Sequence, residues 1–252
     1  MEHPITSKAN PRFKDLLASL RPTGPARTHT LLAGEKLIGT WRVAPFAGRL
    51  LPDSLWVVEG MEVADSLRDL PCPTQSIGEK LMAQLSGSAS PPACALVLRL
   101  GPEPIGPLKN RVIVPWGIQD PGNLGAIFRS AAAFGFQEAL LGPGCADPFS
   151  PKALRGSMGA AFLLPVRRVQ SFDPGDGHWF ALDSGPSAIP LDSADLAEPL
   201  RILVGNEGHG WKHESLPAAV QRVAIPTSGV ESLNAAVAAG IACYEAQRRM
   251  AG

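Results

Sequence analysis

The chain has 252 residues, of which 45% are hydrophobic and 18% are charged, and its 23 basic residues balance its 23 acidic residues. This composition is typical of globular proteins and supplies enough apolar residues for a core without disulfides or metals. A net charge of zero argues against a protein whose whole surface binds nucleic acid, but it is compatible with a local basic face. Residues 1–50 hold eight basic and three acidic residues, a net charge of +5. A polyanion-binding surface and an ordinary solvated face would both explain this excess.

The cysteines and the N-terminal residues indicate the cellular compartment in which we expect the protein. The four cysteines are scattered, and no two have the spacing of metal ligands, so we expect free thiols in a reducing compartment. The N-terminal 15 residues lack the apolar core of a signal peptide. The longest apolar run, Ala235–Tyr244, is about half the length that crosses a bilayer. We therefore expect a cytoplasmic protein with no membrane segment. The cysteines are Cys72, Cys94, Cys145 and Cys243.

Helix and strand patterns alternate over the first hundred residues. Phe13, Leu16, Leu17 and Leu20 recur at helical spacing. The predicted elements are a helix over 11–20, strands over 30–35 and 54–60, a helix over 75–85 and a strand over 93–100.

A Pro/Gly-rich segment, PEPIGP at 102–107, lies between two apolar runs and predicts a linker. We therefore expect an N-terminal domain over 1–100, a linker over 101–109 and a C-terminal domain over 110–252.

Beyond this linker the alternation is clearer. Apolar strands that alternate with helices predict a parallel sheet covered by helices on both faces, which is an α/β fold. Ser150 is a candidate N-cap of the helix at 150–161, because Pro151 occupies its first turn. The predicted strands are 111–116, 137–142, 180–184, 201–205 and 223–227, and the predicted helices are 126–134, 150–161 and 232–249.

The first polar segment, PWGIQDPGNLGAIFR, follows the strand at 111–116. Asn123 is placed where the next helix begins, and Arg129 more than one turn into that helix. Small neighbours at Ala126, Ala131 and Ala132 would let the guanidinium work in a close site. A purely structural interpretation would make Asn123 a helix cap and Arg129 a surface charge.

Two more polar segments follow later strands. In RILVGNEGHGW, a buried strand runs into a glycine-rich loop that holds Glu207 as its one carboxylate, although a plain turn would also use glycines. Ligands bind beyond the carboxyl ends of strands in open parallel sheets. In VAIPTSGVESLN, a short strand leads to Ser232 and Asn234 at a helix start, where unpaired amides can bind polar atoms. Ser232 could equally be an ordinary N-cap.

Taken in order, the patterns N-x-G-x-x-x-R, V-G-N-E-G and I-P-x-x-G-x-x-S-L-N resemble the three motifs of the SpoU (TrmH) family. This family belongs to the SPOUT class of RNA methyltransferases, and the resemblance spans about 110–249. The segments ITSKANPRFK and TLLAGEKLI are similar to the opening helix and first strand of the family's substrate-binding domain.

The resemblance implies a SPOUT-type C-terminal α/β domain with a deep trefoil knot, a smaller N-terminal α/β substrate-binding domain, and a homodimer. It also implies that S-adenosylmethionine is the cofactor, with its adenosine part held by main-chain groups at Gly205, Ile225 and Leu233. The reactive site would be formed by five side chains. They are Asn123, Arg129, Glu207, Ser232 and Asn234.

The implied reaction is methylation of a ribose 2′-hydroxyl in RNA, which must lose a proton as it attacks. His209 is a possible base, but the family motif places no catalytic histidine there. Arg129 stays charged in proteins, so we expect it to fix a phosphate and polarise the hydroxyl, although a role as the base itself stays open. The sulfonium is its own electrophile, so no metal is expected.

The extra N-terminal domain resembles that of enzymes that modify ribosomal RNA, so we expect ribosomal RNA as the substrate. Three alternatives remain. One is methylation of transfer RNA, and another is an RNA-binding homologue that has lost catalysis. A nucleotide-dependent oxidoreductase is disfavoured because the G-x-G-x-x-G fingerprint is absent.

Overall fold

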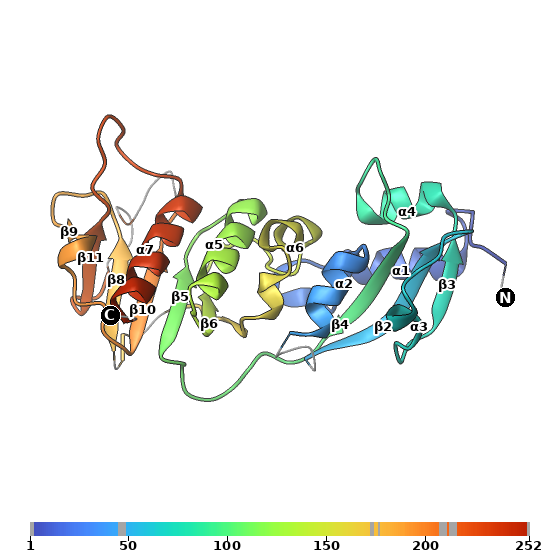
Figure 1. The fold of residues 1–252 in the computed structure, drawn as a ribbon, viewed down its shortest axis with the longest axis horizontal. Coiled ribbons are helices and arrows are strands. Elements are labelled where there is room, and N and C mark those ends of the chain that lie inside the picture. Colours follow the sequence, from blue (N-terminus) through green and yellow to red (C-terminus); the bar gives the residue numbers. More distant parts are fainter. Residues whose placement is uncertain are drawn as a thin grey trace. The chain divides into compact units, whose positions relative to one another are not determined.

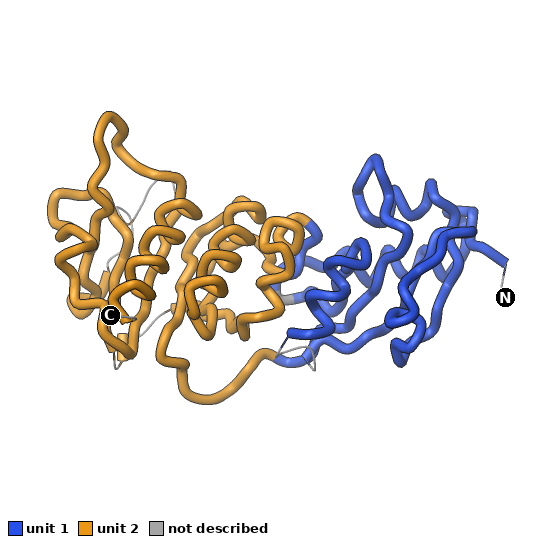
Figure 2. Tube along the Cα trace, viewed as in Figure 1, with its two compact units in different colours: residues 1–102, 149–151 blue, residues 103–148, 152–252 orange. Residues whose placement is uncertain are grey.

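The computed structural model describes residues 3–44, 49–171, 174–175, 177–206, 211 and 216–250. The chain forms two compact units, as Figure 2 shows. Unit 1 comprises residues 1–102 and 149–151, and unit 2 comprises residues 103–148 and 152–252. No helix among the described residues is long and apolar enough to cross a membrane.

Unit 1 contains a four-stranded mixed sheet in the order β1-β4-β2-β3. Its central strand β4 runs antiparallel to β1 and β2, and β3 runs parallel to β2 at the edge. The strands are β1 His29–Ala33, β2 Leu50–Val58, β3 Thr74–Ile77 and β4 Cys94–Leu100. The helices are α1 Pro11–Leu20, α2 Glu35–Arg42, α3 Asp65–Arg68 and α4 Glu79–Ser86.

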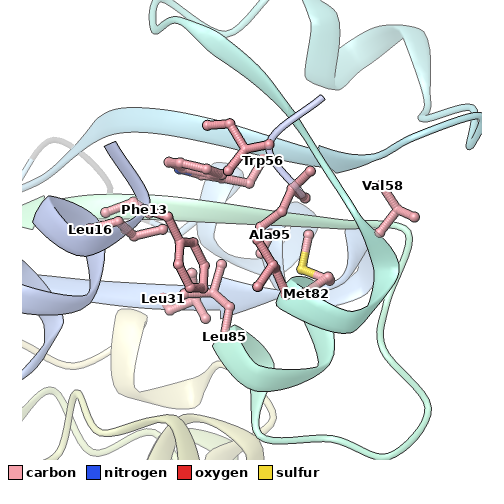
Figure 3. Packing of buried hydrophobic residues seen from close by; sticks show 12 residues of the cluster. Phe13, Leu16, Leu31, Trp56, Val58, Met82, Leu85 and Ala95 are labelled. Atoms are coloured by element: carbon pink, nitrogen blue, oxygen red, sulfur yellow. The ribbon is translucent and has the colours of Figure 1, made fainter. Parts of the chain in front are cut away.

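The core of unit 1 forms where α1 and α4 pack on this sheet (Figure 3). Phe13 of α1 and Met82 of α4 are fully buried against Leu31 and Trp56 of the strands. Asn10 caps α1 by accepting a hydrogen bond from the main-chain N–H of Arg12 at 2.9 Å, so this helix has the predicted bounds.

The predicted helix over 75–85 is wrong in its first turn, because residues 75–77 belong to strand β3. Ile77 is fully buried and pairs with Val58 of β2, so non-local pairing overrides the local helical spacing. Gly78 then separates β3 from α4. Helix α2, which begins at Glu35 inside the predicted strand 30–35, was not predicted.

Unit 2 contains a seven-stranded sheet in the order β7-β6-β5-β10-β8-β11-β9. All strand pairs recorded in this sheet are parallel, which confirms the predicted architecture. The strands are β5 Arg111–Pro115, β6 Glu138–Leu141, β7 Val166–Arg168, β8 His178–Leu182, β9 Ile189–Pro190, β10 Leu200–Val204 and β11 Val220–Ala224. The helices are α5 Pro121–Ala133, α6 Pro151–Ser157 and α7 Ala235–Met250.

Helices α5 and α7 lie side by side against the sheet (Figure 1). The ring of Phe134, at the end of α5, meets the ring of Tyr244 in α7 edge to face, with centroids 5.6 Å apart. One turn earlier in each helix, a Cβ added at Gly240 of α7 would lie 3.3 Å from Oγ of Ser130 on α5. The absent side chain therefore lets the two helices approach closely.

The segment predicted as a linker is held by unit 2 over most of its length. Arg168 of edge strand β7 donates to the Glu103 carboxylate from its main-chain N–H (2.8 Å) and its guanidinium (2.7 Å). Arg167 donates to the carbonyl oxygens of Gly106 (2.6 Å) and Pro107 (3.3 Å). Gly101 belongs instead to unit 1, where its N–H donates to the Arg49 carbonyl at 2.7 Å.

Candidate functional site

The first motif lies at the start of α5. This helix begins at Pro121, five residues before the predicted start at residue 126. Asp120 is the N-cap, and its Oδ1 accepts a hydrogen bond from the main-chain N–H of Asn123 at 2.9 Å. Pro121 occupies the first turn, where a missing N–H costs nothing. The purely structural interpretation of Asn123 as the cap is therefore wrong, because Asp120 caps this helix.

The third motif ends at the start of α7. The Asn234 Oδ1 accepts hydrogen bonds from the main-chain N–H groups of Ala236 (3.0 Å) and Val237 (3.3 Å), so Asn234 caps this helix. Ser232 is exposed two residues earlier and does not supply this cap.

The two motifs meet through their asparagines. Nδ2 of Asn234 donates a hydrogen bond to Oδ1 of Asn123 at 3.3 Å, across 111 positions of sequence. Each asparagine lies in or next to the first turn of its helix, so the N-terminal ends of α5 and α7 come together here. Helix N-termini favour negative charge and polar acceptors.

The second motif joins the same edge of the sheet. Strand β10 pairs with β5, and the N–H of Trp116 donates to the Val204 carbonyl at 2.9 Å. A Cβ on Gly117 would lie 3.6 Å from the Asn206 side chain, so the loops after β5 and β10 are in contact. Glu207 and His209 lie outside the described residues, and their predicted roles stay predictions.

Gly205, the first residue after β10, makes room for a protein side chain. A Cβ there would lie 3.1 Å from the indole of Trp211, which is 1% exposed and donates to the Leu182 carbonyl at 2.9 Å. The glycine is thus required by the packing of Trp211 on the ends of β8 and β10. Ile225 and Leu233, the other two residues expected to hold the cofactor, are half-buried after β11 and before α7.

Arg129 lies on a different side of α5 from Asn123. Six residues at about 100° each separate their directions by roughly 120° around the helix axis. Arg129 is exposed and forms no hydrogen bond or ion pair within the described part of the chain. The structure therefore brings Asn123 and Asn234 together but leaves the Arg129 guanidinium outside this pair.

Comparisons with known proteins show which family the chain belongs to. The model of the "SpoU rRNA Methylase family" matches residues 110–244, more than half of the chain. The chain belongs to the SpoU rRNA methylase family. The predicted family is confirmed, and with it the assignment as an RNA methyltransferase.

SpoU relatives and solved structures extend the likeness to both units. The chain is 31% identical to an uncharacterised tRNA/rRNA methyltransferase of Synechocystis, over 97% of this chain and 93% of that protein. It is 29% identical to 23S rRNA (guanosine(2553)-2′-O)-methyltransferase RlmP of Bacillus subtilis, over 95% and 97%. A crystal structure described as an RNA 2′-O ribose methyltransferase is 27% identical with a TM-score of 0.78, covering 99% of this chain and 100% of that one. The SpoU methyltransferase AviRb of Streptomyces viridochromogenes, solved with AdoMet, shares the fold at 24% identity and a TM-score of 0.80, over 96% and 99%.

Charges next to the SpoU motifs are arranged around Asp120. A hydrogen bond from Lys152 and a second from the Asn123 N–H lower the pKa of the Asp120 carboxyl, which keeps it ionised at neutral pH. Cys145 has its Sγ 3.3 Å from the Pro115 carbonyl oxygen, and burial raises the pKa of its thiol to about 11. A raised pKa favours the neutral thiol over the nucleophilic thiolate. No cluster of three metal-ligating side chains occurs among the described residues.

Sequence reasoning missed two residues beside the SpoU motifs. Asp120 was overlooked, although Asp followed by Pro is a common start of a helix. Lys152 carries no local signal, because its partner Asp120 lies 32 positions earlier.

Proposed function

We propose that the protein transfers a methyl group from S-adenosylmethionine to a ribose 2′-hydroxyl of ribosomal RNA. The observation that carries this proposal is the hydrogen bond between Asn123 and Asn234, because it joins the first and third family motifs. The relative RlmP is named for 2′-O-methylation of 23S rRNA, which supports both the ribose target and the RNA class. Transfer RNA is the alternative substrate.

S-adenosylmethionine is the methyl donor in this proposal. Strands β10 and β11 both pair in parallel with β8, so their carboxyl ends face the same edge of the sheet. The groups expected there are main-chain amides and carbonyls at Gly205, Ile225 and Leu233, and such neutral groups suit the hydrogen-bonding edge of an adenine. This donor set fits the cofactor, which supplies an electrophilic methyl group on sulfur when bound.

The residues of the chain would act on the hydroxyl. Arg129 would hold an adjacent RNA phosphate with its planar guanidinium and polarise the ribose hydroxyl. As the O–C bond forms and the S–C bond breaks, the hydroxyl proton leaves to that phosphate or to water. Asn123, Ser232 and Asn234 would orient the ribose, with Glu207 as the carboxylate of the site. In this proposal the guanidinium of Arg129 stays ionised and the proton is accepted elsewhere.

The two units would divide the work. We propose that unit 1 binds RNA, because the basic excess of residues 1–50 falls within it, and that unit 2 carries catalysis. Lys8 is exposed before α1 and Lys14 is exposed within it, so RNA phosphates could reach both side chains. Replacing both by glutamate should weaken RNA binding and reduce its dependence on salt. An unchanged affinity and salt slope would contradict this division.

A homodimer and a deep trefoil knot, both implied by the family, are part of the proposal. Val237, Ile241 and Tyr244 form an exposed apolar stripe on α7 with exposed fractions of 52%, 39% and 53%. Their spacing of four and three residues places them on one side of the helix, which suits packing against a second copy. A cytoplasmic location is also proposed, because ribosomal RNA is found there.

One experiment tests the function directly. Ribosomal and transfer RNA from a strain that lacks the gene would be incubated with the pure protein and labelled S-adenosylmethionine, and ribose-methylated nucleotides would be identified by mass spectrometry. We expect one labelled nucleotide in ribosomal RNA. Label in transfer RNA would support the alternative substrate, and cofactor or RNA binding with no transfer would indicate a homologue that has lost catalysis.

A further inference from the structure

Helix α6 packs directly against the first turns of α5, main chain to main chain. A Cβ at Gly125 would lie 2.5 Å from the Ala153 carbonyl and 2.7 Å from the Ser157 N–H nitrogen. A Cβ at Gly156 would lie 3.1 Å from the Gly122 carbonyl. A side chain is excluded at Gly125 and would be crowded at Gly156, so α6 packs closely behind the helix that bears Asn123.

One ion pair lies at the edge of this contact. Nζ of Lys152 on α6 is 2.5 Å from Oδ2 of Asp120, while Oδ1 of the same carboxylate accepts the N–H of Asn123. A Cβ at Gly122 would meet Asp120 Oδ1 at 2.8 Å and Lys152 Cε at 3.6 Å. The carboxylate is therefore held from both sides, by the lysine and by the first turn of α5.

Polar contacts thus run continuously from α6 to α7. Lys152 contacts Asp120, Asp120 holds the main chain of Asn123, and the Asn123 side chain accepts from Asn234. Asn234 in turn caps α7. A change in the Asp120 carboxylate would therefore alter the position of Asn123 relative to Asn234.

We propose that Lys152 is a positioning residue for methyl transfer, which acts through Asp120 to fix the turn that carries Asn123. This inference rests on the proposed function, in which Asn123 and Asn234 belong to the reactive site. The side chains of Lys152 and Asp120 are 59% and 46% exposed, and ion pairs as exposed as this contribute little to folding stability. If this ion pair served only stability, its removal should change almost no property of the protein. If it positions the turn, its removal should lower the rate of methyl transfer in a protein that is still folded.

The test compares Lys152→Gln, Lys152→Arg and Asp120→Asn with the control Lys109→Gln, which changes another exposed lysine of unit 2. Asparagine at 120 can still cap α5 but carries no charge for Lys152. For single-turnover transfer to the RNA of the deletion strain, we expect Lys152→Gln and Asp120→Asn to lower the rate about tenfold, as small misplacements at a reactive site do. The double variant should be no slower than either single one, since the two residues act as one unit. Lys152→Arg and Lys109→Gln should keep the wild-type rate.

Cofactor affinity, the KM for RNA and Tm should be unchanged in the four single variants and in the double variant. A raised KM for RNA with an unchanged rate would overturn the proposal in favour of a phosphate contact by Lys152. A loss that follows Tm, or one shared by Lys109→Gln, would overturn it in favour of general destabilisation.

Hydrogen exchange at the main-chain amide of Asn123 tests the same contact and does not depend on catalysis. Lys152→Gln and Asp120→Asn should speed this exchange, whereas Lys152→Arg should not. Were the wild-type protein to transfer no methyl group, the proposed function would fail, and the exchange result would still decide whether Lys152 fixes the turn. Unchanged exchange in Lys152→Gln would overturn the inference.

Discussion

Asn234 uses both ends of its side-chain amide, capping α7 with its oxygen and donating from its nitrogen to Oδ1 of Asn123 at 3.3 Å. The two functions can be separated by substitution, because aspartate is as good an N-cap as asparagine but has no N–H to donate.

Asn234→Asp should fold with wild-type stability and lose methyl transfer, because its carboxylate faces the Asn123 oxygen with no proton to share. Asn234→Ala should lose transfer as well and should also lower the free energy of unfolding by about 1 kcal/mol through loss of the cap. Urea unfolding and single-turnover transfer measure the two effects. Normal transfer by Asn234→Asp would show that the contact between the asparagines is not part of the reactive site.

Arg129→Ala should fold and bind S-adenosylmethionine almost normally but transfer the methyl group about a hundredfold more slowly, a loss of about 3 kcal/mol in the transition state. Arg129→Lys should fail nearly as badly, since an ammonium cannot reproduce the planar guanidinium. Calorimetry with the cofactor and single-turnover kinetics with RNA check this. Wild-type rates in both variants would mean that Arg129 is only the exposed surface charge of the purely structural interpretation.

The sequence predicted five of the seven strands of unit 2, because these strands are apolar runs, such as Ile202 and Leu203 in β10. The edge strands β7 and β9 were missed, since three and two residues are too few to show a strand pattern. The strand at 75–77 was missed because it is stabilised by pairing with β2, which local spacing does not report. The contact of Asn123 with Asn234 has no local signal, and only the family motifs suggested that these residues belong together. Asp120 could have been found from its place before Pro121, whereas its pairing with Lys152 needed the fold.

Ile241→Glu should convert the proposed homodimer to a monomer at micromolar concentration, because it places a charge in the middle of the exposed stripe on α7. Val43→Glu changes an apolar side chain that is more exposed, at 83%, but lies in unit 1, and it should leave the dimer intact. Light scattering gives the mass of each. A wild-type protein that is already a monomer would contradict the dimer itself.

Glu245 should make the stability of unit 2 depend on pH. Hydrogen bonds from Arg248 and then from Arg249 lower the pKa of its carboxyl to about 2, from an ordinary value of 4.5. A lowered pKa in the folded state stabilises the fold above pH 4.5 and loses that contribution as the pH falls toward 2. Glu245→Gln should therefore unfold at lower urea than the wild type at pH 7, and the difference should shrink between pH 4.5 and pH 3. A difference that is constant over this range would contradict the assignment.

The attachment of residues 103–107 to β7 makes this segment part of unit 2 and not a free linker. Gly101 is bonded within unit 1 and Glu103 within unit 2, so Pro102 alone lies between these two anchors. Because residues 103–107 are bonded to β7, a substitution in this segment should act on the edge of the sheet of unit 2.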